Sequence, residues 1–189
     1  MNIVFGGTFN PPTKAHYLII NYLLNKYNPE NLIIVPVSNK YPKEKISDEK
    51  RLEMLEILFK NKDRRIIISD IEIKNKIVGT YYTLKELNKE YQDIYFIMGA
   101  DNFSYLDKWI ESKKLLNEFK FIIISRDNID IKKLIKSKFK DYQNNIIIDN
   151  NLNFDISSTK IRENKLFTKE YLNEEIIDYI KKNNLYKEE

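Results

Sequence analysis

Short apolar runs alternate along the chain with longer segments whose apolar residues recur at helical spacing. Such alternation is typical of an α/β fold, because each helix returns the chain across a parallel sheet. We therefore predict a Rossmann-like, doubly wound parallel sheet. Strands are expected at residues 3–5, 32–35, 66–68 with a ragged continuation to 73, 94–98, 119–124 and 146–148. Helices are expected at about 13–27, 47–58, 80–91, 129–139 and 168–183.

The size and composition of the chain fit one domain. Its 189 residues are enough to bury a core of their own. We assign residues 1–189 to a single domain, which includes a C-terminal helical segment at about 157–185. A hydrophobic content of 42% and a charged content of 32% are typical of a soluble globular protein. The chain has no cysteine, which excludes disulfides and thiolate metal sites.

Charge and targeting signals narrow the class of partner. No apolar run is long enough to cross a membrane, and no basic segment followed by an apolar stretch opens the chain. We therefore expect a cytoplasmic protein that does not bind membranes. The formal net charge of +4 is spread thinly, which favours a small anionic substrate over nucleic acid. The amphipathic C-terminal helix fits either the core or a partner subunit, so a homo-oligomer stays an open alternative.

Polar residues that follow strands are the first candidates for a site, because ligands of doubly wound sheets bind at the carboxyl ends of the strands. After the first strand come Gly6-Gly7, a proline-containing loop and the start of a helix that carries His16, the only histidine. Glycines let an anion approach the backbone closely, and a helix N-terminus offers unpaired N–H groups. By itself, a glycine pair is more often a tight turn, and His16 a partly buried polar residue.

A second polar cluster lies near the C-terminus, where Ser157, Ser158 and Thr159 open a helix that carries Arg162 one turn later. The hydroxyl and backbone groups can donate to one anion, and the guanidinium can add two parallel hydrogen bonds. Alone, such a run is more often a helix N-cap. The sequence thus predicts two anion-binding segments about 140 residues apart.

The two segments together resemble the signatures of the nucleotidylyltransferase superfamily, G-G/S-x-F-x-P-x-H/T-x-x-H and I-S-S-T-x-I-R. Thr13 stands where bacterial members usually carry histidine, and Ala15 where they carry glycine. The resemblance implies that the second segment binds the triphosphate of ATP and that His16 and Arg162 are the catalytic residues. Two further segments narrow the family.

The segment Gly99-Ala100-Asp101, with Leu106 and Trp109 in register, is similar to the stretch G-A-D-x-x-x-x-L-x-x-W of pyridine mononucleotide adenylyltransferases. In that family the glycine and aspartate contact the nucleotide, and the tryptophan helps to form the pyridine pocket. Ile110 replaces a frequent tyrosine. Without the family resemblance, a turn followed by a helix cap, with Trp109 as a core aromatic residue, would explain the segment equally well.

Two weaker matches to the family concern the residues that would bind the second substrate, the mononucleotide. Residues 39–43 and 51–55 resemble the N-P-P-H-K loop and R-L-x-M-L helix of the nicotinate mononucleotide enzymes, although a solvated lysine-rich loop is the competing interpretation. Residues 80–84 resemble the end of S-Y-T-x-D-T-L, from which Val78, Gly79 and Tyr82 depart. On this reading Thr80 faces the pyridine carboxylate or amide.

The resemblance gives a full set of expected site residues. The ATP-binding residues are Gly6, Gly7, Thr8, Phe9, Thr13, His16, Gly99, Asp101, Ser125, Ile156, Ser157, Ser158 and Arg162. The residues that bind the second substrate are Asn39, Lys40, Lys43, Thr80, Asp101 and Trp109. No protein metal site is expected, and Mg²⁺ would be bound mainly through the ATP phosphates.

The function hypothesis is an adenylyl transfer from ATP to nicotinate mononucleotide, which gives the dinucleotide and pyrophosphate. A mononucleotide phosphate is already a nucleophile, so positioning and charge stabilisation carry the reaction. Nicotinamide mononucleotide, both pyridines together, and the pantetheine-phosphate reaction of the same superfamily remain alternatives. From a different class, a nucleotide-binding module without turnover also remains, because Thr13, Ala15 and the altered acceptor loop depart from the family pattern.

Overall fold

The computed structural model describes residues 1–38, 46–59, 62–125, 129–151 and 158–186. Its centre is a six-stranded sheet in the order β3-β2-β1-β4-β5-β6, in which all neighbours are parallel. The order reverses between β1 and β4, so the predicted doubly wound sheet is confirmed. The strands are β1 Asn2–Gly7, β2 Asn31–Pro36, β3 Ile66–Ile68, β4 Ile94–Gly99, β5 Lys120–Ile124 and β6 Ile146–Asp149.

The strands are apolar along their whole length because both faces of the sheet are covered. Successive side chains of a strand point to opposite faces. Ile3 therefore belongs to one hydrophobic core and Val4 to the other, and both are fully buried. Ile97 and Phe96 divide in the same way on β4. The two cores explain why the sequence shows continuous apolar runs and not an alternating pattern.

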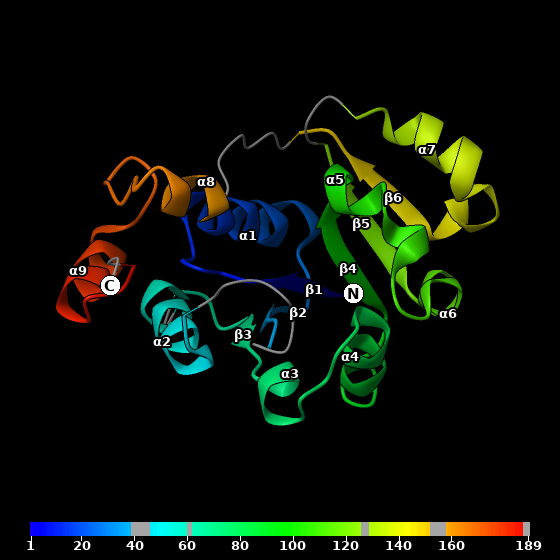
Figure 1. Ribbon diagram of the computed structural model, residues 1–189. Helices are drawn as coiled ribbons and strands as arrows, with labels where there is room; N and C mark the ends of the chain where they lie inside the picture. Colours follow the sequence, from blue (N-terminus) through cyan, green and yellow to red (C-terminus); the bar gives the residue numbers. More distant parts are fainter. Residues whose placement is uncertain (39–45, 60–61, 126–128, 152–157, 187–189) are drawn as a thin grey trace.

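Helices from distant parts of the chain cover the two faces, with α1 and α4 on opposite sides of β1 (Figure 1). The first core is closed by α1 Lys14–Tyr27, α2 Asp48–Phe59, α8 Ser158–Glu163 and α9 Glu174–Lys182. The second is closed by α4 Thr80–Leu87, α5 Ala100–Phe103, α6 Ser112–Glu118 and α7 Ile131–Lys138. Short helical pieces complete the described chain: α3 Ile71–Lys74, η1 Leu106–Lys108 and η2 Lys140–Asn145. None of the helices in these ranges has both the length and the apolar character that crossing a membrane requires.

Three predicted elements differ from the structure. The expected ragged strand to residue 73 is wrong, because the ladder ends where Ser69 N–H donates to the Ile34 carbonyl (2.9 Å) and α3 begins at Ile71. The helix expected at 80–91 ends at Leu87. The helix expected at 168–183 begins only at Glu174, because the preceding residues form turns that deliver the Tyr171 carbonyl to Lys14 N–H (2.9 Å).

The last strand is tied to α1 by a buried carboxylate. Asp149, whose side chain is fully buried, accepts hydrogen bonds from Tyr22, Lys26 and Tyr27 on α1, the last two at 2.8 Å. Burial alone would raise the pKa of Asp149, but these donors and the Asn151 N–H hold it below its usual value. Burial and the same carboxylate raise the pKa of Tyr27 to about 12.

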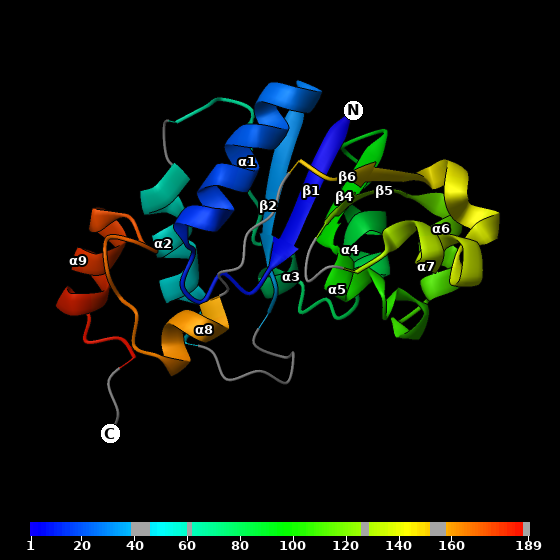
Figure 2. The same cartoon turned by 90° about the horizontal axis from the view of Figure 1, so that it is seen from above.

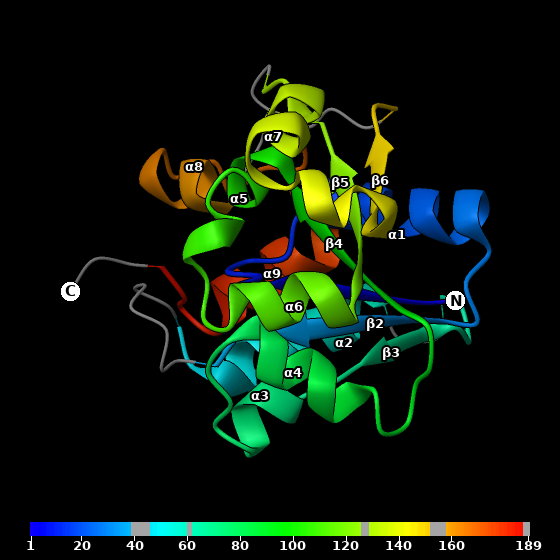
Figure 3. The same ribbon diagram turned by 90° about the vertical axis from the view of Figure 1, so that its right-hand side faces the viewer.

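Because the sheet is parallel, all six carboxyl ends lie at one edge. Seen from above, β1 ends beside α8, at the opposite end from the N-terminus (Figure 2). A view from the side shows the same arrangement, with the N-terminus and α8 at opposite ends of β1 (Figure 3). This edge brings together the two segments that the sequence analysis singled out.

Candidate active site

The loop between β1 and α1 is built around two close approaches. An ideal Cβ at Gly7 would lie 3.0 Å from Cζ of Phe9, and one at Gly6 would lie 3.2 Å from the ring of Phe96. Phe9 is fully buried with a positive φ of 45°, and its ring lies 5.0 Å from that of His16. Gly7 therefore lets the loop fold back on its own Phe9, and Gly6 leaves room for the ring of Phe96 on β4. The backbone of Gly7 and Thr8 is carried to the edge of the sheet.

His16 and Thr13 cap α1 reciprocally. Thr13 N–H donates to Nδ1 of His16 (2.9 Å), and His16 N–H donates to Oγ1 of Thr13 (3.3 Å). Because Nδ1 accepts a hydrogen bond, the neutral imidazole carries its proton on Nε2. The histidine thus has a fixed ring orientation and one defined donor atom.

This capping corrects one expectation from the sequence. The N–H groups of Thr13 and His16 are engaged by each other's side chains, and that of Lys14 donates to the Tyr171 carbonyl. An anion at this helix would therefore depend on the helix dipole and on Nε2 more than on unpaired N–H groups. Thr13 is 1% exposed and works as the N-cap, so its predicted contact with ATP stays a prediction.

α8 reaches the same loop from the other end of the chain. Ser158 donates to the Pro11 carbonyl (2.8 Å), and Arg162 donates through Nη1 to the Asn10 carbonyl (2.5 Å). Two of the predicted ATP-binding residues are thus brought to the β1–α1 loop. Ile156 and Ser157 lie outside the described residues, as do Asn39, Lys40 and Lys43.

Arg51 holds the loop from a third direction. Its fully buried guanidinium donates to the carbonyls of Thr8 (2.8 Å) and Val37 (2.6 Å) and pairs with the carboxylate of Asp48. Burial lowers the pKa of Arg51, and the Asp48 carboxylate opposes that shift. In the sequence, Arg51 stands out only as the first residue of a family-like helix motif. In the structure it connects the ends of β1 and β2.

The opposite face of β1 carries an apolar surface. The indole of Trp109 meets the ring of Phe96 edge to face, with centroids 6.3 Å apart. Gly79, at the N-terminus of α4, adopts a φ of +107°, and an ideal Cβ there would lie 3.3 Å from Cβ of Ile110. Thr80 follows Gly79 and Trp109 precedes Ile110, so the two chain segments that carry Thr80 and Trp109 lie against each other. Gly79 and Ile110, which both depart from the family pattern, are in contact.

The other predicted ATP-binding residues lie at the ends of β4 and β5. Asp101 stands in the first turn of α5 directly after Gly99, and its backbone carbonyl accepts from Ser104 (2.7 Å). Ser125 follows β5, two strands from β1, and its hydroxyl donates to Asn150 (2.5 Å) beyond β6. Gly99 and Asp101 thus adjoin β1, whereas the described partner of Ser125 lies on the far side of the sheet.

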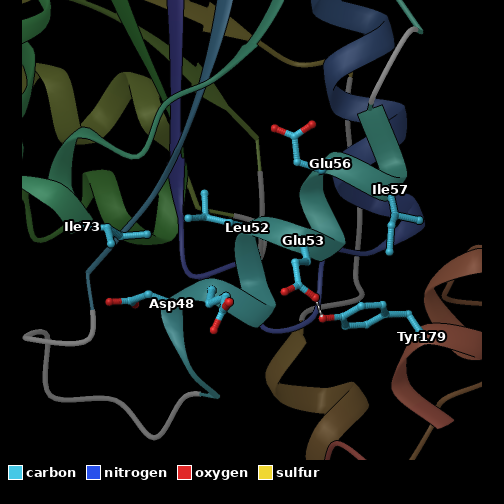
Figure 4. Close-up of a pocket in the computed structure, with 8 residues that line it drawn as sticks. Asp48, Leu52, Glu53, Glu56, Ile57, Ile73 and Tyr179 are labelled. Atoms are coloured by element: carbon cyan, nitrogen blue, oxygen red, sulfur yellow. Dashed lines mark hydrogen bonds between the residues drawn. The ribbon is translucent and has the colours of Figure 1, made fainter. Parts of the chain in front are cut away.

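A cavity of about 940 Å³ lies between α2, α3 and α9, and of the residues named above only Asp48, the partner of Arg51, lines it (Figure 4). Leu52 and Ile73 are among its lining residues, and Glu53 accepts a hydrogen bond from Tyr179, both of which also line it. Four carboxylates line it: Asp48, Glu49, Glu53 and Glu56. Their negative charge repels phosphate, so this cavity is not a nucleotide site.

Known proteins match this chain over the segments described above. The model of the cytidylyltransferase-like family matches residues 4–164. A probable nicotinate-nucleotide adenylyltransferase of Acholeplasma laidlawii is 37% identical over 190 residues, covering 100% of this chain and 98% of that relative. A second, from Clostridium acetobutylicum, is 37% identical over 196 residues and covers 97% of each chain.

A solved structure agrees with the fold. The nicotinic acid mononucleotide adenylyltransferase of Plasmodium falciparum, complexed with NaAD, superimposes with a TM-score of 0.79 at 27% sequence identity. The match covers 98% of this chain and 96% of that one.

Proposed function

The chain belongs to the cytidylyltransferase-like family, among the nicotinate-nucleotide adenylyltransferases, and we propose that it joins ATP and nicotinate mononucleotide. In this reaction a phosphate oxygen of the mononucleotide attacks the α-phosphorus of ATP. The bond from that phosphorus to the oxygen bridging the α- and β-phosphates breaks, and pyrophosphate leaves with the electron pair. The products are nicotinate adenine dinucleotide and pyrophosphate, so the protein acts in NAD biosynthesis.

One observation carries the proposal within the molecule. The β1–α1 loop, with Nε2 of His16 as a defined donor, is held against α8 by Ser158 and Arg162. A triphosphate that lies along this edge would meet His16 at one end and the guanidinium at the other. Charge that develops on the transferred phosphoryl group and on the leaving pyrophosphate would be stabilised by donors already in position.

The division of labour follows from the two faces of β1. We assign the α-phosphate to His16 and to the backbone of Gly6 and Gly7, and the β- and γ-phosphates to Ser157, Ser158 and Arg162. The pyridine ring would lie against Trp109, with Thr80 near its carboxylate. Asp101, in the first turn after β4, is assigned to a ribose.

Mg²⁺ fits this arrangement as an ion carried by the nucleotide. Within the described ranges, no three His, Cys, Asp or Glu residues are grouped so that they could hold a metal. Mg²⁺ commonly keeps most of its waters and binds through substrate phosphates with few protein ligands. When bound, it neutralises phosphate charge; the orientation of the phosphates is the work of His16 and Arg162.

Pyrophosphate release with ATP and Mg²⁺ tests the proposal, with nicotinate and nicotinamide mononucleotide supplied in parallel. A strong preference for the acid is the expected result. Comparable rates would indicate dual specificity and point to the altered residues around Thr80. If neither pyridine mononucleotide gives pyrophosphate release, the proposed pyridine substrate is wrong, and phosphopantetheine would be tried next. Tight ATP binding without turnover on any acceptor would favour a non-catalytic module.

A further inference from the structure

The side chain of Asn10 is held by the end of the chain. Tyr186, which follows α9, donates its hydroxyl to Oδ1 of Asn10 at 2.7 Å, across 176 positions of sequence. Asn10 is 1% exposed and lies in the β1–α1 loop, next to the cis peptide bond with Pro11. Neither residue was singled out by the sequence, since a tyrosine near a terminus carries no pattern of its own.

Tyr186 is itself fixed in place. Its ring stacks on that of Phe167, with centroids 5.2 Å apart and an interplanar angle of 19°. Leu185 N–H donates to the Ile180 carbonyl (3.0 Å), which connects the residue to the end of α9. Burial raises the pKa of Tyr186, with Arg162 and Arg51 acting against the shift. The phenol therefore stays protonated at neutral pH and can donate.

Tyr186 and Arg162 both donate hydrogen bonds to Asn10. Arg162 donates to the carbonyl of Asn10, and Tyr186 donates to its side-chain amide oxygen. Ser158 takes the carbonyl of the next residue, Pro11. Thr13, which orients His16, follows two positions later. The conformation of Asn10 therefore bears on both assigned phosphate contacts, His16 and Arg162.

We propose that Tyr186 is a positioning residue of the nucleotide site, acting through Asn10 to hold the β1–α1 loop in the conformation that receives ATP. The inference rests on the proposed function for the identity of the nucleotide. It adds that the segment after α9 is part of the donor site. Tyr186 does not contact the reacting atoms. Loss of its hydroxyl should therefore weaken the binding of ATP and leave the binding of the mononucleotide unchanged.

The variant Tyr186→Phe removes the hydroxyl and keeps the stacked ring. We expect the Kd and the KM for ATP to rise about fivefold, the effect of one neutral hydrogen bond. The KM for the mononucleotide is expected to stay within about twofold, because the acceptor surface lies on the other face of β1.

Tyr179→Phe is the matched control. Tyr179 lies one turn from the end of α9 and donates to Glu53, with which it lines the acidic cavity (Figure 4). This variant also loses a tyrosine hydroxyl that bonds to a distant segment, here from α9 to Glu53 on α2, but it is expected to leave the Kd for ATP unchanged. An equal rise in both variants, or none in Tyr186→Phe, would overturn the proposal.

A double-mutant cycle with Asn10→Ala tests the route of the effect. If Tyr186 acts through Asn10, adding Tyr186→Phe to Asn10→Ala produces no further rise in the Kd for ATP. Full additivity would show that the phenol acts elsewhere and would overturn the inference. ATP binding is measured by calorimetry without an acceptor. Absent turnover would therefore count against the proposed function, whereas an unchanged Kd would count against Tyr186.

Discussion

The two faces of β1 hold their parts of the site by different means. On the face of α1 and α8, the loop is fixed by hydrogen bonds from Arg51, Ser158, Arg162 and Tyr186. On the face of α4, the contacts of Trp109 with Phe96 and of Gly79 with Ile110 are apolar. The hydrogen bonds of that face join its own neighbouring elements, as from Thr83 on α4 to Glu72 on α3 (2.6 Å). The difference fits the two assigned ligands. A phosphate needs donors in fixed directions, whereas a flat ring needs an apolar surface of the right shape.

On the hydrogen-bonded face, we expect the largest loss of stability from a substitution of Arg51. We expect Arg51→Met to lower the free energy of unfolding by about 3 kcal/mol, because it leaves buried carbonyls and the Asp48 carboxylate without their donor. Urea denaturation measures this loss. Arg65→Met is the control: Arg65 pairs with Asp63 near the surface (2.7 Å), and we expect a loss below about 1 kcal/mol. Equal losses would mean that the buried ties of Arg51 are not special.

The donor atom of His16 should be the next largest effect. We expect His16→Ala to lower kcat by about tenfold or more with both substrates saturating, since a donor to the phosphoryl group is lost. Thr13→Ala controls for the capping, because it removes the hydroxyl to which His16 N–H donates and keeps the imidazole. Near-wild-type turnover in His16→Ala would mean that His16 has no part in the chemistry. An equal loss of kcat in Thr13→Ala would mean that the capping pair, and not the donor atom alone, carries the effect.

Asp149 tests whether buried hydrogen bonds outside the β1–α1 loop contribute to stability as those of the loop do. Its folded-state pKa is lowered, so its contribution to stability is present above the unfolded value of about 4 and is lost as pH falls through the lower folded value. We expect Asp149→Asn to cost about 1 kcal/mol at pH 7. The difference from wild type should shrink below about pH 4 in a series of urea titrations. A constant difference down to pH 3 would contradict the assignment.

The apolar side should respond to shape at Gly79. We expect Gly79→Ala to raise the KM for the mononucleotide about threefold, because a φ of +107° strains any Cβ and the new methyl meets Ile110. The KM for ATP should not change. Ile110→Ala in the same background removes the Cγ2 and Cδ1 contacts (3.5 Å each) and should recover part of the effect. A rise in the KM for ATP instead would contradict the separation of the two faces.

The sequence predicted the fold well because a parallel sheet buried on both faces leaves a strong signal. The apolar runs at 3–5, 32–35, 66–68, 94–98, 121–124 and 146–148 all lie in strands, and the order of elements followed. The short helix α3 was missed because Ile71 and Ile73 continue the apolar pattern of β3 with no breaker of their own. The start of α9 was misplaced because the turns before it are fixed by distant partners, among them Lys14.

The sequence predicted less of the site than of the fold, because contacts between distant residues leave no local pattern. Motifs located His16, Ser158 and Arg162, but not the capping role of Thr13 or the bond from Tyr186. Such roles depend on which backbone groups meet in space, and local spacing does not encode that. The buried ties of Arg51 are of the same kind, since their acceptors are main-chain carbonyls of Thr8 and Val37.

The ties between the β1–α1 loop and the end of the chain also have a consequence for synthesis. Arg162 and Tyr186 bond to Asn10 across 152 and 176 positions. On the ribosome, β1 and α1 emerge long before these partners, and closing so long a loop is slow compared with forming local helices. The β1–α1 loop therefore gains these two hydrogen bonds only after residues 162 and 186 have been translated. A growing chain cannot capture ATP in its final form until its closing residues have been translated.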